Sequence, residues 1–278
     1  MSRAIARGLG KKLLAGPFVV WMVLFTFIPL AMMFARGFVD KSGNFTLDNI
    51  LAITKPIYAE SLWLSLELSL LSTAICLLLA YPLALILRKM KNGSTGVIIF
   101  LFVLPMWMNF LLRTIAWQSL LEKEGVINGI LSALGLPALE IINTPAAIVL
   151  GMVYNYLPFM VLPLYNALSK IDDSVIFAAY DLGANYMKTL GRVIIPQSVA
   201  GIISGITMVF VPSLTTFVVS DILGGGKVML IGNVIEQQFT VSYDWSTGAG
   251  LSIVLMVFVL ASMAVMNAFD KNGEVRTL

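Results

Sequence analysis

Histidine is absent from the 278 residues of this chain. Because histidine is the commonest general base near neutral pH and the commonest metal ligand, its absence removes the simplest routes to acid–base catalysis and metal binding. The one cysteine, Cys76, lies inside an apolar run, so the chain has no disulfide framework. Charge is also scarce, since only 12% of the residues are Asp, Glu, Lys or Arg. A soluble domain carries roughly a quarter, so a water-facing surface is excluded for most of the chain.

Apolar residues fill the space that charge leaves. They make up 59% of the chain, and the mean hydropathy is +0.92. A membrane-spanning helix needs ~20 mostly apolar residues to cross a hydrocarbon core of ~30 Å. Six stretches meet this requirement: Leu13–Ala35, Leu62–Leu87, Val97–Ile115, Ala146–Leu168, Ser198–Val219 and Gly248–Ala268. The sequence therefore predicts an all-α membrane protein with six transmembrane helices, in which residues 1–278 form one domain.

Basic residues are distributed unevenly between the two sides of these spans. Twelve Lys and Arg residues fall on the side that holds both termini, and six fall on the other. The richer side is normally cytoplasmic, so both termini are expected in the cytoplasm. The outer loops are long, acidic and partly apolar, as at 126–130 and 230–235, which predicts short interfacial helices or re-entrant segments there.

The loop between the fourth and fifth predicted spans has the pattern of two short helices. Asp173 or Ser174 would cap the first helix, and Gly183 would end it, because glycine adopts the left-handed conformation without strain. The second helix would run from about Asn185 to Arg192, and Pro196 would open the next membrane helix. The result is a helix-turn-helix on the cytoplasmic side of the membrane.

This loop resembles the EAA loop of binding-protein-dependent ABC importer permeases, which reads E-A-A-x3-G-x9-I-x-L-P. The matching positions are Ala178, Ala179, Gly183, Val193, Ile195 and Pro196. Phe177 departs from the pattern, because it stands where the family has glutamate. The resemblance implies the type I ABC importer permease fold, with residues of about 169–196 as a coupling loop that docks on a separate ATPase. The residues implied in that contact are Phe177, Ala178, Ala179, Asp181, Leu182, Gly183 and Pro196.

Several other segments are similar to those of spermidine/putrescine permeases. They are Gly43–Asn49, Leu104–Arg113, Tyr156–Met160, Val219–Gly225, Leu230–Ile235 and Tyr243–Trp245. The resemblance implies the pore-forming permease subunit of an ATP-driven polyamine importer in the bacterial inner membrane. It implies as partners a dimer of ATP-binding subunits, a second homologous permease, an extracytoplasmic polyamine-binding protein and membrane lipid, but no nucleic acid.

No cofactor is expected in this chain, and ATP and Mg would be bound by the partner ATPase. The run Gly224–Lys227 is followed by Val228 rather than Ser or Thr, so it lacks the pattern of a phosphate-binding loop.

Two carboxylates are candidates for contact with a cationic substrate, because a charge near the bilayer usually faces a cavity or a partner. They are Glu67 in the second span and Asp221 just after the fifth. Ser220, the neighbour of Asp221, is a candidate for the same substrate pathway. The aromatic rings of Trp107, Tyr154 and Phe217 could bind ammonium groups by cation–π contact. The alternative is that the carboxylates lie in interfacial water and that the rings are interface anchors or packing residues. Arg113 is expected to be an anchor or the partner of a carboxylate.

Other functions fit the same composition. A permease of this build could carry an opine, another amine, an anion or a metal chelate, and a passive channel would need no ATPase. An intramembrane serine protease requires a histidine, which is lacking. An aspartyl protease requires two membrane-embedded aspartates, whereas Asp181 lies in a loop. The enzyme hypothesis is therefore disfavoured.

Overall fold

The computed structural model describes the backbone of residues 16–40, 42–90 and 94–275. Residues 13–15 of the first predicted span, and both chain ends, lie outside these ranges. The chain falls into two compact units. The first contains the described residues up to Tyr58 together with Ile235–Val257, and the second contains Ala59–Val234 together with the residues from Phe258 on. The prediction of one membrane domain stays a prediction.

The first unit is built around an apolar helix, Gly16–Gly37, which includes a π-helical turn, η1 (Val23–Phe27), and α2 (Ile28–Gly37). A side-chain carbon added at Gly37 would lie 3.4 Å from the backbone of Ala249, so this helix packs directly on the last helix of the chain. The Asn49 amide donates to the carbonyls of Gly37 and Val39 at 3.2 and 3.0 Å, which holds the following turn in place. That turn contains α3 (Asp48–Leu51) and η2 (Ala52–Thr54).

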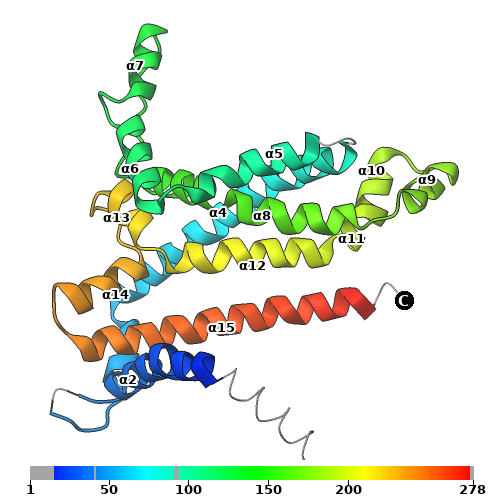
Figure 1. Ribbon diagram of the computed structural model, residues 1–278. Coiled ribbons are helices and arrows are strands. Elements are labelled where there is room, and N and C mark those ends of the chain that lie inside the picture. Colours follow the sequence, from blue (N-terminus) through cyan, green and yellow to red (C-terminus); the bar gives the residue numbers. More distant parts are fainter. Residues whose placement is uncertain (1–15, 41, 91–93, 276–278) are drawn as a thin grey trace, which may run out of the picture. The chain divides into compact units, whose positions relative to one another are not determined.

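Three long helices form the core of the second unit (Figure 1): α4 (Pro56–Lys89), α8 (Pro145–Ser169) and α12 (Val199–Thr215). The face of α4 that is buried consists largely of small residues, which allow close helix approach. Between α8 and α12 the approach is closest at Gly201 and Gly205. A side chain at Gly205 would lie 2.6 Å from the Met160 sulfur, and one at Gly201 would collide with Ala167. Gly201 and Gly205, one helical turn apart, therefore form the face of α12 that contacts α8.

Two predicted spans are bent in the structure. The third prediction, Val97–Ile115, is wrong as a straight helix, because α5 (Ser94–Val103) and η3 (Leu104–Trp107) are followed by a 92° bend. Asn109 causes the break: its side chain accepts from the Leu111 N–H at 2.9 Å and starts a new helix, α6 (Phe110–Leu121). The second bend, of 67°, lies at Ser198, immediately before α12.

The remaining elements are short helices and one long terminal helix: α7 (Val126–Ala133), α9 (Asp173–Asp181), α10 (Tyr186–Thr189), η4 (Leu190–Ile194), α11 (Ile195–Gln197), α13 (Val218–Gly224), α14 (Ile231–Thr240) and α15 (Trp245–Val275). The short helices predicted near 126–130 and 230–235 are confirmed as α7 and α14. Within the described residues, four helices are long and apolar enough to span a membrane, or up to six if each bent pair is one span.

Candidate functional site

The loop that resembles the coupling loop begins with a capped helix. Asp172 is the N-cap of α9, because its carboxylate accepts from the Ser174 N–H at 2.8 Å. The sequence placed this cap at Asp173 or Ser174, so the prediction was off by one or two residues. Hydrogen bonding to the Ser174 backbone and side chain lowers the pKa of the Asp172 carboxyl, so the cap stays ionised near neutral pH. Its contribution to helix stability is present at neutral pH and is lost as the pH falls through this lowered pKa.

The end of α9 is a Schellman motif centred on Gly183. Gly183 has a φ of 80°, and its N–H donates to the Tyr180 carbonyl at 2.9 Å. The Ala184 N–H donates to the Ala179 carbonyl at 3.0 Å, which completes the motif. The predicted role of Gly183 as helix terminator is confirmed.

The second limb of the loop starts where the sequence predicted. Asn185 is the N-cap of α10 and accepts from the Lys188 N–H at 2.9 Å. The chain continues through the π-helical η4 into α11, which contains Pro196. The prediction that Pro196 opens the next membrane helix is wrong. The 67° bend follows Pro196, and α12 begins only at Val199.

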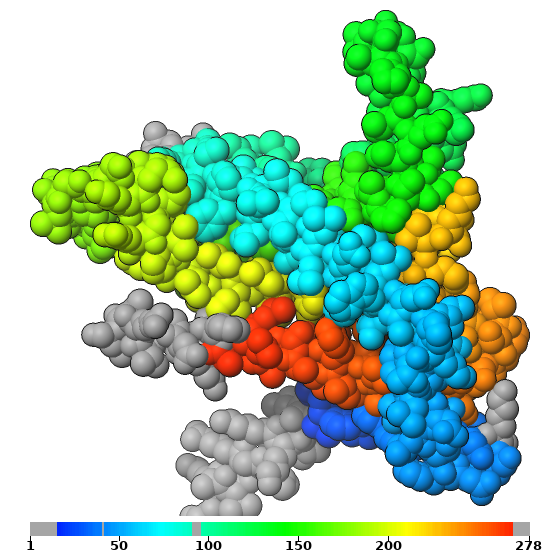
Figure 2. All heavy atoms as spheres, turned by 180° about the vertical axis from the view of Figure 1, so that it is seen from behind, coloured from blue at the N-terminus to red at the C-terminus, as the bar shows by residue number. Residues whose placement is uncertain are grey.

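The loop lies at the surface of the second unit (Figure 2), and several of its exposed side chains are apolar. Phe177, Leu182 and Met187 are 62, 89 and 70% exposed, whereas Ile176 on the inner face of α9 is buried. Ala178 and Asp181 are exposed as well, and Ala179 is half-buried. We call the exposed apolar residues of this loop (Phe177, Tyr180, Leu182 and Met187) the loop surface. Exposed apolar surface of this kind marks an interaction site.

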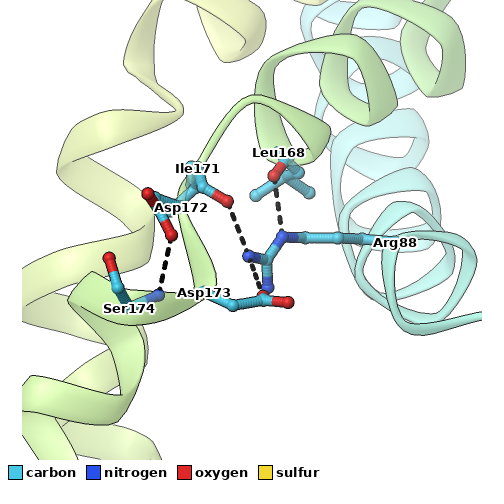
Figure 3. Close-up of polar contacts among 6 residues, drawn as sticks. All are labelled: Arg88, Leu168, Ile171, Asp172, Asp173 and Ser174. Atoms are coloured by element: carbon cyan, nitrogen blue, oxygen red, sulfur yellow. Dashed lines mark hydrogen bonds and ion pairs between the residues drawn. The ribbon is translucent and has the colours of Figure 1, made fainter.

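Arg88, in the last turn of α4, contacts the beginning of this loop (Figure 3). Its Nε donates to the Leu168 carbonyl at 2.8 Å. Its Nη2 donates both to the Ile171 carbonyl, at 2.9 Å, and to the Asp173 carboxylate, at 2.7 Å. The sequence analysis did not single out Arg88 as a site residue. No local signal marks it, because its partners lie 80 to 85 residues further along the chain.

Glu67 lies deeper in the second unit than the sequence indicated. The second predicted span begins at Leu62, five residues before Glu67, whereas α4 begins at Pro56, so Glu67 is about three turns into the helix. Its side chain is exposed and lines two cavities. One, of about 680 Å³, is lined by α4, α6 and α8, and the other, of about 1090 Å³, by α4, α12 and the part of α15 from Phe258 on. The other lining residues are mostly apolar, so Glu67 is the charged group of both cavities.

Tyr154 lines the smaller of these cavities with Glu67, but its ring is already in contact with a cation. The Arg113 guanidinium lies 5.9 Å from the centre of the Tyr154 ring and donates to the Pro105 carbonyl at 2.9 Å. Arg113 is therefore held by a carbonyl and by aromatic rings in the described residues, and not by the carboxylate that was one of its expected partners. A substrate ammonium would compete with Arg113 for Tyr154. Trp107 is well exposed and packs edge-on against Phe100.

Phe217, Ser220 and Asp221 lie together where α12 gives way to α13. Asp221 is exposed in the first turn of α13, and the Phe217 ring is partly exposed. Ser220 is fully buried, and its hydroxyl bonds to the Phe217 carbonyl and to Asn233. In this conformation Ser220 holds the loop together, and its predicted place on a substrate pathway has no exposed atom to support it.

Asn233 organises this segment. Its amide donates to the Phe217 carbonyl at 3.0 Å, and its oxygen accepts from the Leu230 N–H at 3.2 Å. The next N–H, of Ile231, donates to the Ser65 hydroxyl of α4 at 2.8 Å. The α13–α14 segment is thereby fixed to α4 through buried polar contacts.

An Asn233→Ala exchange is expected to destabilise the protein by about 1–3 kcal/mol, because buried groups are left without partners. Thermal unfolding in detergent would show a lower midpoint. Thr240→Ala is the control, since the Thr240 hydroxyl is exposed and bonds only within its own helix, to Glu236. Equal midpoints for the two variants would contradict the assignment.

The described part of the chain thus combines long apolar helices and two bent helix pairs with an exposed helix-turn-helix loop. A family model for the binding-protein-dependent transport system inner membrane component matches residues 6–273. The chain belongs to this family and is an inner-membrane protein.

Individual relatives define the class further. The spermidine/putrescine transport system permease protein PotB of Haemophilus influenzae is 39% identical over 247 residues, covering 86% of each chain. The protein of that name from Escherichia coli K12 is 40% identical, covering 86% of this chain and 90% of its own. A chain of a bacterial ABC transporter that imports the acidic polysaccharide alginate superposes with a TM-score of 0.81 at 16% identity, covering 97% of this chain and 98% of that one. This confirms the predicted type I importer permease fold.

Proposed function

We propose that this chain is the permease subunit of an ATP-driven polyamine importer, with spermidine or putrescine as the substrate class. The observation that carries the proposal is the identity of about 40% with two spermidine/putrescine permeases over most of both chains. The chain belongs to a family of inner-membrane components whose transport systems depend on a binding protein. This membership supports an extracytoplasmic binding protein as one partner. A second homologous permease would complete the pore.

The energy source is a separate pair of ATP-binding subunits, which hold ATP and Mg. A phosphate-binding loop places its glycines before the N-terminus of a helix. The run Gly224–Gly226 instead forms the C-terminal end of α13 and the turn after it, where Gly225 has a φ of 56°. That geometry supports nucleotide binding by the partner.

The loop surface is the docking site for the ATPase, on the cytoplasmic side, where both termini also lie. Phe177, Ala178, Ala179, Asp181, Leu182 and Gly183 all belong to α9 or its terminating turn. Since Phe177 replaces the carboxylate of the family pattern, the contact is made chiefly by apolar burial. Burial of a phenylalanine or leucine contributes roughly 1.5–3 kcal/mol.

The substrate pathway passes Glu67. A polyamine is a chain of methylene groups interrupted by ammonium groups. The Glu67 carboxylate can bind an ammonium group, and the apolar cavity walls can contact the methylene groups. Trp63, Phe210 and Phe258 line the larger cavity and add aromatic faces to it. Asp221, beside Phe217, is a second acidic group on the outer side of the pathway.

Glu67→Gln is expected to reduce amine uptake at low substrate concentration by at least about tenfold, because a charge-assisted hydrogen bond contributes about 1.5–3 kcal/mol. The measurement is concentration-dependent uptake of radiolabelled spermidine by proteoliposomes. The matched control is Glu60→Gln, an exposed carboxylate near the start of the same helix. If both variants transport equally well, Glu67 is not on the pathway.

The function itself is tested by reconstituting this permease with its second permease, ATPase and binding protein. ATP-dependent accumulation of spermidine or putrescine is expected, with competition by unlabelled amines. Flux without ATP would indicate a passive channel instead. Accumulation of an opine, an anion or a metal chelate, but not of polyamines, would replace the substrate assignment and leave the permease assignment intact.

A further inference from the structure

Several side chains of α4 contact the loop between α8 and α12, and Arg88 makes the most extensive contacts. Arg88 is 11% exposed at its side chain, although its partner Asp173 is 56% exposed. Its three acceptors belong to consecutive segments: Leu168 to the last turns of α8, Ile171 to the connecting turn and Asp173 to the start of α9. One guanidinium therefore joins α4 to the beginning of the loop.

Arginine suits this position for a specific physical reason. The last carbonyls of a helix have no partner within the helix, and α8 ends at Ser169. A guanidinium offers several N–H donors in a rigid plane, so it can bind two carbonyls and a carboxylate at once. Lysine is a point charge and cannot reproduce that geometry.

The same end of α4 also contacts the far limb of the loop. The Lys89 ammonium lies 5.2 Å from the centre of the ring of Tyr186, the first residue of α10. About two turns earlier in α4, the Tyr81 hydroxyl lies 2.9 Å from the hydroxyl of Ser198, at the 67° bend before α12. We call these three side chains (Tyr81, Arg88 and Lys89) the α4 clamp. The clamp holds the loop at its beginning and at its end.

We propose that the α4 clamp transmits movement of the docked loop into the membrane, with Arg88 as its main positioning residue. The inference rests on the proposed function, because it takes the loop surface to be the ATPase contact. If α4 is tied to both limbs, displacement of the loop moves α4 with it, and α4 carries Glu67. Without Arg88 the loop can pivot at residues 169–172, and ATP hydrolysis proceeds without moving the pore.

Arg88→Gln is the first test, in proteoliposomes containing the complete transporter. The variant is expected to retain its ATPase subunits and ATP hydrolysis, while the number of substrate molecules imported per ATP falls at least about tenfold, the factor lost with one charge-assisted hydrogen bond. Arg88→Lys should fall between wild type and Arg88→Gln. The control is Lys123→Gln. This exchange also breaks an ion pair, the one between Lys123 and Glu140, but both of those side chains are exposed.

A covalent replacement for the ion pair gives the sharper result. In a Cys76→Ala background, Arg88→Cys with Asp173→Cys should be uncoupled, and joining the two thiols with a short bis-maleimide should restore import per ATP. A merely stabilising role predicts instead that the thermal midpoint falls, that hydrolysis and import fall together, and that the linker changes only stability.

Three results would overturn the proposal: normal coupling in Arg88→Gln, no recovery on linking, or parallel loss of import and hydrolysis. If Arg88→Gln does not reach the membrane, Arg88→Lys and Tyr81→Phe decide the question, and normal coupling in both is contrary to it. A wild-type transporter that imports no amine with ATP would refute the proposed function and is recognised before any variant is made.

Discussion

A Leu182→Asp protein is expected to reach the membrane and to lose its ATPase subunits on purification. Leu182 is the C-cap of α9, and at 89% exposure it is among the most accessible of the large apolar side chains. Docking would bury this side chain, so an aspartate there would place an unpaired charge in an apolar contact. Together with the lost apolar burial, the expected weakening is about 2–5 kcal/mol, or roughly thirtyfold to several thousandfold in affinity.

Val241→Asp is the matched control for this exchange. Val241 directly follows α14, as Leu182 directly follows α9, and it is 70% exposed. Both variants thus add a negative charge at the C-terminal end of a helix, and only one of them lies on the loop surface. Co-purification of the ATPase, measured in stable detergent complexes, should be lost in Leu182→Asp alone. Retention of the ATPase in Leu182→Asp would remove the docking assignment.

A Gly183→Val exchange is expected to abolish most transport without unfolding the protein. A β-branched residue at a φ of 80° is strongly disfavoured and costs about 1–3 kcal/mol. The Schellman turn that directs α9 toward α10 would open, and the docking geometry would change. Uptake is expected to fall about fivefold to 150-fold, in line with that strain.

The control for Gly183 lies at the end of α7. Gly135 has a φ of 71°, its N–H donates to the Ser132 carbonyl, and the Leu136 N–H donates to the Leu131 carbonyl, which is the same motif. Neither Gly183 nor Gly135 has atoms within 4 Å of an added side-chain carbon. Gly135→Val therefore imposes the same strain outside the coupling loop. Equal loss of uptake in both variants would show that strain alone, and not its location, is responsible.

Local signals account for the parts of the structure that the sequence predicted. The apolar stretches around α4, α8 and α15 are helices, because length and composition determine whether a segment can remain in the hydrocarbon core. Gly183 and Asn185 delimit the loop helices, because glycine at a helix end and asparagine at a helix start act on neighbouring backbone groups.

Distant contacts and bends account for the parts that it did not. Hydropathy averaged over a span cannot separate a straight helix from two helices at 92°, because the few residues at the break hardly change the average of a window of ~20 residues. Asn109 was the available signal, since asparagine is a preferred N-cap. Arg88 carried no comparable signal, because its role depends on carbonyls and a carboxylate brought to it by tertiary packing.

The length of α4 links events at opposite membrane faces. Its 34 residues correspond to about 51 Å, well beyond the ~30 Å of hydrocarbon that a helix must cross. Arg88 near one end binds the beginning of the loop between α8 and α12, and Ser65, about 35 Å away along the same helix, accepts from the Ile231 N–H. If α4 tilts by one-tenth of a radian, the contact at one end therefore moves relative to the contact at the other by about 3.5 Å. Because one helix makes both contacts, any tilt of α4 displaces them together.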